Sequence, residues 1–145
     1  MDIIVKETSI EEALKVFGKI SEFDRPEYGT VEFFKERIDN KDCLILSAYA
    51  HEDIVGYFIA YEKDDSFYCW LAAVEPKYRK NGILTKMMNI YEEYARNNEY
   101  INLTIKTGNN KREMLSYLVK NNWNFVEVIP GEKLEDNEII LKKEL

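Results

Sequence analysis

Residues 74–84 read Val-Glu-Pro-Lys-Tyr-Arg-Lys-Asn-Gly-Ile-Leu, and they join two segments of opposite character. An apolar run of strand type, residues 67–74, precedes the loop, and apolar residues recur at helical spacing from Gly82 onward. The first turn of a helix presents unpaired backbone N–H groups and a partial positive charge. A glycine there lets the backbone approach an anion closely, and Arg79 and Lys80 add formal charge. The segment therefore predicts a strand–loop–helix site for a diphosphate.

A basic surface turn in front of an ordinary helix is the alternative interpretation of this loop, and loop composition alone does not decide between the two. No Gly-Lys-Ser or Gly-Lys-Thr closes the loop, so it is not a Walker loop. Nor does it have the three glycines of the dinucleotide-binding fingerprint.

Hydrophobic periodicity predicts the elements on either side of this loop. A capping box from Ser9 to Glu12 begins a helix that runs to about Ile20, and Thr30 caps a second, shorter helix to about Asp39. A third helix starts at Gly82, and a fourth carries an apolar stripe of Met114, Leu115, Leu118 and Val119. Strands are expected at residues 3–7, 43–50, 54–61, 67–74, 101–105, 123–129 and 138–142.

The order of these elements predicts a single domain over residues 1–145, because no internal repeat or linker interrupts it. Tight polar turns between the second, third and fourth strands indicate an antiparallel meander. In the fifth strand Ile101, Leu103 and Ile105 alternate inward. The fold class expected is α+β in α/β/α layers, with a mixed, mostly antiparallel sheet of about seven strands and about four helices.

Composition limits the classes of function. The chain has 145 residues, 46% of them hydrophobic, with 20 basic and 27 acidic residues, a net charge of −7. These values indicate a packed globule and argue against a nucleic-acid partner. The acidity fits a cationic substrate, and solubility alone explains it equally well. No apolar run approaches a membrane span of about 20 residues, and residues 1–6 do not begin a signal peptide, so a cytoplasmic protein without membrane contact is expected. Cys43 and Cys69 are expected in the core, not in a disulfide or a metal site.

The pattern Val74-x-Pro76-x-x-Arg79-x-x-Gly82, together with the order of elements, resembles the cofactor motif of the GNAT acetyltransferase superfamily. The resemblance covers most of the chain and is most specific from Leu44 to Phe125. It implies acetyl-coenzyme A as cosubstrate and no metal. Backbone groups of Ala72, Ala73 and Val74 would pair with the pantetheine arm. The pyrophosphate would lie on N–H groups of Arg79, Lys80, Asn81, Gly82, Ile83, Leu84 and Thr85. Asn109 or Asn110, with Asn110 preferred, would touch the cofactor; Leu84 departs from the family's Gly or Ala.

The resemblance leaves the catalytic residues open. The family commonly protonates the leaving thiolate with a tyrosine on the fourth helix. Counting seven residues from Asn110 gives Tyr117, whereas counting back five from Trp123 gives Leu118. Leu118 lies at the centre of the apolar stripe, so the second register is favoured, and Tyr117 is expected at a boundary. Asn122 replaces a family glycine, and Asn tolerates the left-handed conformation required there.

Two further features of the family are weakly represented. Its occasional glutamate base on the fifth strand has no counterpart at residues 104–106. Glu22, Asp24 and Glu27 would lie at the mouth of the acceptor site, or simply form a solvated acidic loop. Four aromatic residues either wall that site or belong to the core: Phe23, Tyr28, Phe33 and Phe34.

The sequence thus predicts an N-acetyltransferase that acts by direct attack of an amine, cationic before reaction, on a small molecule or protein. A non-catalytic acyl-coenzyme A-binding or regulatory module of the same fold is the alternative, and an unrelated α+β interaction protein is a third hypothesis. A homodimer is allowed by the sequence but not decided by it.

Overall fold

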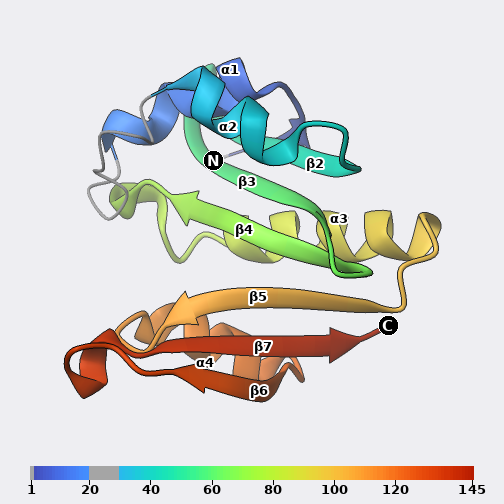
Figure 1. Ribbon diagram of the computed structural model, residues 1–145. Helices are drawn as coiled ribbons and strands as arrows, with labels where there is room; N and C mark the ends of the chain where they lie inside the picture. The colour runs from blue at the N-terminus through green and yellow to red at the C-terminus, as the bar shows by residue number, and fades with distance from the viewer. Residues whose placement is uncertain (1, 20–29) are drawn as a thin grey trace.

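The computed structural model describes residues 2–19 and 30–145, and its strands form one sheet in the order β1-β2-β3-β4-β5-β7-β6 (Figure 1). The strands are β1 (Ile3–Glu7), β2 (Cys43–Ala50), β3 (Asp53–Lys63), β4 (Ser66–Val74), β5 (Asn102–Gly108), β6 (Asn124–Ile129) and β7 (Glu138–Glu144). Neighbouring strands are antiparallel except β4 and β5, which are parallel. The predicted meander of β2, β3 and β4 and the mixed seven-stranded sheet are confirmed.

Helices cover both faces of the sheet, which makes three layers (Figure 1). On one face lie α1 (Ile10–Ala13), its continuation η1 (Leu14–Lys19) and α2 (Val31–Ile38). On the other lie α3 (Ile83–Asn97) and α4 (Arg112–Lys120). Alternate residues of the central strands enter two separate cores: in β2, Ile45 packs on the α1–α2 side and Leu46 on the α3 side. Short 3₁₀ turns η4 (Pro76–Tyr78) and η5 (Leu134–Asp136) complete the described chain.

The helix expected from Ser9 to about Ile20 differs from the prediction. Only residues 10–13 are α-helical, and residues 14–19 continue as a 3₁₀ helix; residue 20 lies outside the described part. Ser9 does cap the helix, since its Oγ accepts the Glu12 N–H at 3.2 Å. Glu12 does not complete the capping box, because its carboxylate binds Lys15 at 2.9 Å and the Tyr49 hydroxyl at 3.1 Å. The carboxylate is thus bound by a local partner, Lys15, and by a tertiary one, Tyr49.

Two predicted core residues are on the surface. Ile101, expected to alternate inward, is 73% exposed because the strand begins only at Asn102. Val119, expected in the apolar stripe of α4, is 55% exposed because the helix lies near the edge of the sheet, where less of its circumference is covered. Of the two cysteines, Cys69 is buried and Cys43 half-buried, both as free thiols. No helix within residues 2–19 and 30–145 is long and apolar enough to cross a membrane.

Strands β4 and β5 separate partway along their length, and this separation positions the candidate site. They pair only at Phe67–Leu103, Tyr68–Thr104 and Cys69–Ile105. A β-bulge follows, because Ile59 of β3 pairs with Leu71 and Ala60 with Cys69, leaving Trp70 as the extra residue. Trp70 and Leu71 consequently both pack on the α1–α2 side. Figure 1 shows β5 diverging from β4 beyond this point.

Candidate functional site

The part of β4 beyond the bulge presents a backbone edge toward the space between the two strands. Within the described residues, the register with β5 ends at Cys69, so the backbone of Ala72 and Ala73 has a strand partner only on the β3 side. A polar backbone edge of this kind can pair with an extended ligand bearing amide groups, as an added strand would. The Val74 carbonyl is less available to a ligand, because it already accepts the Arg79 Nε–H at 2.9 Å.

The loop after β4 is held in shape by its own side chains. Arg79 bonds back to the end of β4, as just described, and therefore contributes to the loop's conformation as well as its charge. The Asn81 side-chain amide donates to the carbonyls of Tyr78 at 2.9 Å and Arg79 at 3.2 Å. The Lys77 Nζ lies 3.8 Å from Glu75 Oε1, whereas Lys80 is exposed. The sequence motif predicted the loop but not these internal bonds.

The first turn of α3 has the properties of an anion site. Lys80 and Gly82 both adopt positive φ, 66° and 76°. Gly82 is the N-cap, so no side chain caps the helix, and the first turn contains no acidic residue. The first backbone hydrogen bond of α3 runs from the Lys86 N–H to the Gly82 carbonyl. The N–H groups of residues 83–85 precede this bond, so they have no partner within the helix and point out of its end. A Cβ added at Gly82 would meet no protein atom within 4 Å, so the space in front of the turn is open.

The departure at Leu84 does not obstruct this space. The side chain of Leu84 packs against the main core cluster on the α3 side, as does that of Ile83. Thr85 is exposed on the first turn. The backbone N–H at residue 84 is therefore not covered by its own side chain.

The two asparagines before α4 have different roles. Asn109 ties the loop to the β6–β7 connection: its N–H donates to the Asn137 carbonyl at 2.7 Å and its side-chain amide to the Leu134 carbonyl at 3.0 Å. Asn110 is exposed. Helix α4 begins only at Arg112, with Lys111 as N-cap. Of the pair, Asn110 is the residue whose side chain remains available to a ligand.

On α4, Leu118 is fully buried and Tyr117 is half-buried, as the helix-face argument predicted. Tyr117 nevertheless faces α3, where its hydroxyl lies near Thr85 in the first turn. Burial, and then the charge of Glu92, raise the pKa of Tyr117, while the nearby Thr85 side chain opposes the rise. Tyr117 is thus protonated at neutral pH and lies at the predicted phosphate end of the site. Asn122 has a φ of 68°, the left-handed conformation expected of it.

The β-bulge is lined by aromatic residues on the α1–α2 side. Trp70 packs against Phe34 at a centroid distance of 5.2 Å and Phe33 at 6.0 Å, and the Arg37 guanidinium lies over its ring at 4.8 Å. Phe34 is fully buried, whereas Phe33 is partly exposed. Trp70 was not predicted as a site residue, because nothing in the apolar run of residues 67–74 distinguishes a bulged residue from a paired one. Glu22, Phe23, Asp24, Glu27 and Tyr28 lie outside the described residues.

Strand β5 offers no carboxylate in its central part. Thr104 bonds to Ser66 at 3.1 Å, Ile105 is buried, and Lys106 lies 3.8 Å from Glu138. Sequence and structure thus define an open backbone edge, an uncapped helix N-terminus beside it and an aromatic bulge, without an identified base.

Such a combination suits an extended ligand that carries amide groups and an anionic end. The chain matches the model of the acetyltransferase (GNAT) family over residues 10–117 of 145. The chain therefore belongs to the GNAT acetyltransferase family, and the third hypothesis, an unrelated interaction protein, is excluded. A comparison with curated protein sequences found no match.

Solved structures show the same fold. The Ard1 protein of Thermoplasma volcanium has a TM-score of 0.80 at 13% identity, covering 100% of this chain and 99% of its own. An IAA acetyltransferase from Bacillus cereus has a TM-score of 0.78 at 16% identity, covering 99% and 100%. A GNAT family acetyltransferase from Elizabethkingia anophelis, solved with acetyl-CoA bound, has a TM-score of 0.70 at 17% identity, covering 99% and 98%. The predicted GNAT fold is confirmed.

Proposed function

We propose that this protein transfers an acetyl group from acetyl-coenzyme A to an amine. The observation that carries the proposal is the combination of the open β4 edge beyond Cys69 with the uncapped first turn of α3. Ala72 and Ala73 would hydrogen-bond the pantetheine arm through their backbone. N–H groups between Arg79 and Thr85 would hold the pyrophosphate, and Asn110 would add a side-chain amide.

The chemistry requires an attack on the thioester carbonyl. The amine, once neutral, forms the new C–N bond, the C–S bond breaks, and coenzyme A leaves as thiolate or thiol. A pantetheine arm that follows β4 away from the α3 turn leads toward the bulge at Trp70. The acceptor would then be bound beside Trp70 and Phe33, whose aromatic faces suit an organic cation.

We further propose that the acceptor is cationic before reaction, as the net charge of −7 favours. The carboxylates Glu22, Asp24 and Glu27 are the candidates for its recognition. Within the described part of this surface, Arg37 lies over the Trp70 ring, and its positive charge would oppose the binding of a cation. It would favour an acceptor that also carries an acidic group. Acceptors should therefore be compared by charge.

The test is release of coenzyme A thiol from acetyl-coenzyme A over a panel of amines. The panel contains polyamines, amino sugars, peptides with free N-termini and anionic amino acids, and mass spectrometry checks each product for an added acetyl group. Turnover with polyamines or basic peptides would support the proposal, whereas a preference for anionic amino acids would contradict the charge assignment. Tight acetyl-coenzyme A binding without turnover would favour the non-catalytic module, which the absence of a carboxylate at residues 104–106 of β5 makes the second candidate.

We also propose that the protein forms a homodimer. The support for this is the edge strand β6, in which Phe125, Val126 and Val128 are each more than half exposed.

A further inference from the structure

Arg37 is held over the bulge of β4 by its position on α2. It follows Phe33 by four residues and Phe34 by three, so the three side chains share one helix face. The Arg37 Cζ lies 4.8 Å from the centroid of the Trp70 ring, and Nη1 donates to the Tyr61 hydroxyl at 3.3 Å. These contacts fix the guanidinium plane, yet no acidic side chain in the described part of the chain forms an ion pair with it.

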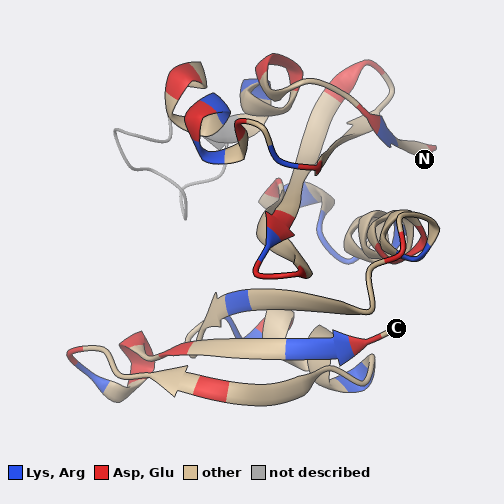
Figure 2. Ribbon diagram, turned by 45° about the vertical axis from the view of Figure 1, so that its right-hand side comes forward, with Lys and Arg blue, Asp and Glu red and all other residues tan. Residues whose placement is uncertain are grey.

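Lys106 of β5 stands across from Trp70. The register of β4 and β5 ends at the pair Cys69–Ile105, so one further step would bring Trp70 level with Lys106. Ile105 belongs to the core on the α3 side, and successive strand residues face opposite sides, so Lys106 faces the α1–α2 side as Trp70 does. In Figure 2, β5 carries one blue band, which is Lys106. A positive charge therefore lies on each side of the point at which the strands separate.

The cosubstrate does not account for these two charges. Its pyrophosphate is assigned to the first turn of α3, which covers the other face of the sheet (Figure 1). Arg37 and Lys106 face the side on which the acceptor is proposed to bind, and Glu138, at 3.8 Å from Lys106, offsets only one of them. An acceptor with ammonium groups alone would be repelled here, whereas one that also brings a carboxylate would be attracted.

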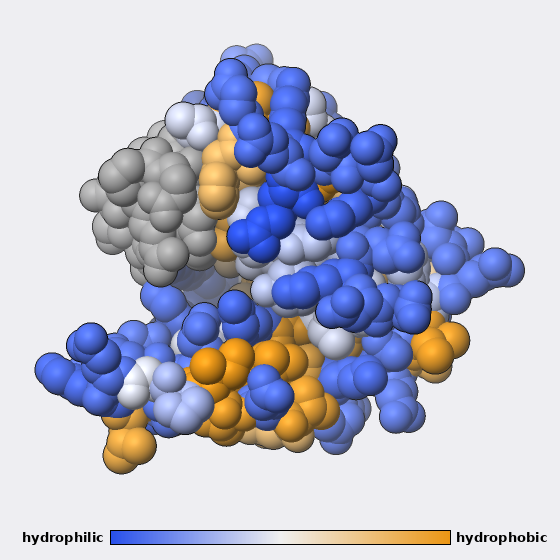
Figure 3. All heavy atoms as spheres, in the orientation of Figure 1, coloured by the Kyte–Doolittle hydropathy of each residue, from blue (hydrophilic) through white to orange (hydrophobic). Residues whose placement is uncertain are grey.

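A hollow of about 450 Å³ continues from Lys106 over the same face, between the β3–β4 hairpin and the open side of β5 and β7. Its lining includes Tyr68, whose pKa is raised by burial while the charge of Arg37 opposes the rise, so its hydroxyl is protonated at neutral pH. The charges at the hairpin and on β7 balance: Lys63, Lys142, Asp64 and Asp65. Figure 3 shows hydrophilic surface over α2 and the hairpin and apolar surface over β7 and β6. This face has room for a small organic acceptor, with the excess positive charge at its Arg37 and Lys106 end.

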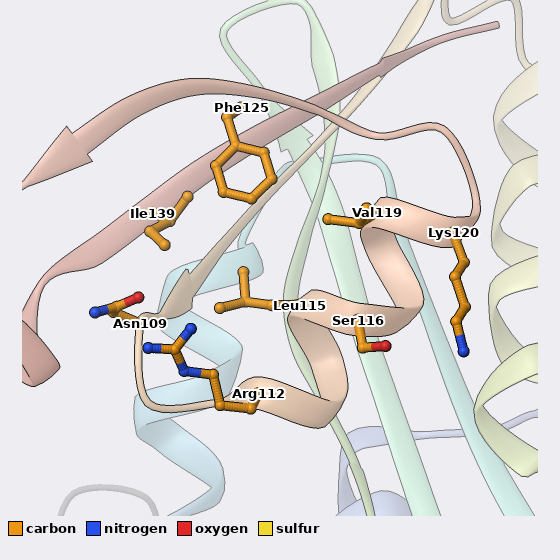
Figure 4. A pocket seen from close by; sticks show the side chains of 8 residues that line it. All are labelled: Asn109, Arg112, Leu115, Ser116, Val119, Lys120, Phe125 and Ile139. Atoms are coloured by element: carbon orange, nitrogen blue, oxygen red, sulfur yellow. The ribbon is translucent and has the colours of Figure 1, made fainter.

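Another hollow, of about 420 Å³, lies on the opposite face between α4 and β6 and provides a comparison. In Figure 4, Leu115 and Val119 of α4 point toward Phe125 of β6, and Arg112 lies at one end. Within the described residues its lining includes none from β4, so a molecule bound there would not reach the thioester. Arg112 is an exposed helical arginine like Arg37 and therefore a matched control.

We propose that the acceptor is an amino acid whose carboxylate binds the Arg37 guanidinium, with Lys106 as the second positive charge, while its amine reaches the thioester. A guanidinium held by stacking presents its N–H fork to a carboxylate with little further loss of freedom. The amine is an ammonium before reaction, and the side chain lies against the rings of Trp70 and Phe33. The inference rests on the proposed acetyl transfer and names the substrate class of that same site.

The experiment compares matched acceptors in the coenzyme A release assay. L-Phenylalanine, L-methionine and L-lysine are each tested against their carboxamides, which keep the amine and the side chain but lack the negative charge. A site selective for cations alone would prefer the amides. The wild type should instead show a kcat/KM at least about tenfold higher for the acid than for the amide of the preferred pair.

Arg37→Gln should bring this acid-to-amide ratio close to one, because the carboxylate loses its partner. Arg37→Lys keeps the charge but not the planar fork, so it should lower the ratio only in part. The control Arg112→Gln should keep the wild-type ratio. Circular dichroism verifies the fold of each variant, and if Arg37→Gln does not fold, Arg37→Lys decides.

The inference is overturned by a wild type that uses the amides as well as the acids, by an Arg37→Gln variant that loses both alike, or by an Arg112→Gln variant that loses the ratio as fully. In each case coenzyme A is still released, so acetyl transfer stands. If no acceptor releases coenzyme A, calorimetric titration of the coenzyme A-saturated protein decides. Binding of an acid but not of its amide, lost in Arg37→Gln, would keep the carboxylate site and refute the reaction; equal binding or none would overturn the inference as well.

Discussion

At the scale of single residues, Gly82 combines a requirement of the backbone with a requirement of the ligand. Its φ of 76° disfavours any residue with a Cβ, and a Cβ there would project into open space, where the phosphates are proposed to lie. Gly82→Val should therefore weaken acetyl-coenzyme A binding by more than about tenfold. Lys80→Ala, which removes one solvated charge, should weaken it only a few-fold. Titration calorimetry measures both, and equal losses would contradict binding by the backbone.

The control for backbone strain is Gly82→Asn. Asparagine tolerates the left-handed conformation, so this variant should keep the melting temperature of the wild type while still placing a side chain in front of the α3 turn. Normal affinity in Gly82→Asn, together with a loss in Gly82→Val, would show that strain and not obstruction is responsible.

Tyr117 provides a second test at this scale. Its hydroxyl lies near Thr85, at the end of the proposed site assigned to the pyrophosphate rather than to the thioester. Tyr117→Phe should therefore lower kcat by less than about tenfold, a barrier change under about 1.4 kcal/mol. Any effect should be larger on KM for acetyl-coenzyme A. Steady-state kinetics with an independent measurement of cofactor affinity decide the question, and a hundredfold fall in kcat with unchanged affinity would identify Tyr117 as the acid.

The sequence predicted which residues form the loop better than what each side chain does. Gly82 was singled out because a glycine lets the backbone approach an anion, and its φ of 76° is a second requirement that only the structure shows. Arg79 was predicted to add charge at the phosphates, yet its guanidinium also bonds the Val74 carbonyl. Trp70 was missed because a bulge depends on the register of two strands, and register is a property of the pair and not of either sequence.

At the scale of elements, the end of α3 is fixed to the start of β2 by one carboxylate. Asp42 accepts the hydroxyl of Tyr94 at 2.5 Å and that of Tyr100 at 2.7 Å. Both rings stack on Phe67, at centroid distances of 5.2 and 4.8 Å. Asp42→Asn should lower the free energy of unfolding by about 2 kcal/mol, because two charge-assisted hydrogen bonds become weaker or are lost.

Urea denaturation measures this change, and Asp65→Asn is the matched control. Asp65 is exposed with a φ of 63°, a conformation that asparagine accepts, so its substitution should change stability by less than about 0.5 kcal/mol. A loss in Asp42→Asn no larger than in the control would show that the two tyrosines are held by stacking alone.

The same cluster predicts a pH dependence. Burial, and then the hydrogen bond and charge of Asp42, raise the pKa of Tyr94 and of Tyr100 above the ordinary value of 10.0. Above about pH 10 the unfolded tyrosines lose protons while the folded ones retain them, so the contribution of the cluster to stability is complete below pH 10 and falls as the pH rises. The stability difference between wild type and Asp42→Asn should consequently narrow above pH 10. Denaturation series at pH 8 and above pH 10 measure it; a constant difference would contradict this account.

Element boundaries were predicted where local signals agree with tertiary contacts. The Ser9 and Thr30 caps are present, and β2 has the predicted bounds. The length of the first α-helix and the burial of Val119 were wrong, because both depend on what the rest of the fold places against the helix. Periodicity identifies an apolar stripe but not the width of the surface that covers it.

At the scale of the whole molecule, the fold class and the meander of β2, β3 and β4 were predicted from the sequence of elements, whereas the placement of β7 between β5 and β6 was not. The two halves of the sheet, β1 to β4 and β5 to β6, are joined in register by only three residue pairs between β4 and β5. The separation beyond Cys69 arises from the bulge at Trp70 and from β5 being held by β7 over its full length, Asn102 to Gly108. Neither feature has a signature in a single strand.

This construction predicts how the cosubstrate affects global stability. A ligand that lies along β4 and contacts Asn110 after β5 connects both halves, and because it binds only the folded state it stabilises that state by mass action. Acetyl-coenzyme A at 100 times its Kd should add about 2.7 kcal/mol, which raises the melting temperature of a chain of this size by several degrees. Gly82→Val should show a much smaller shift at the same concentration.

Amide hydrogen exchange locates the effect. On addition of acetyl-coenzyme A, protection should increase at Ala72, Ala73 and residues 82–85, because these amides lie on the open edge of β4 and in the uncapped turn. The amides of β6 should not respond, because that strand lies at the edge of the sheet, with β5 and β7 between it and β4. An unchanged melting temperature at millimolar acetyl-coenzyme A would refute the binding site itself. A shift in melting temperature with increased protection at other amides would show that acetyl-coenzyme A binds, but at a site away from β4.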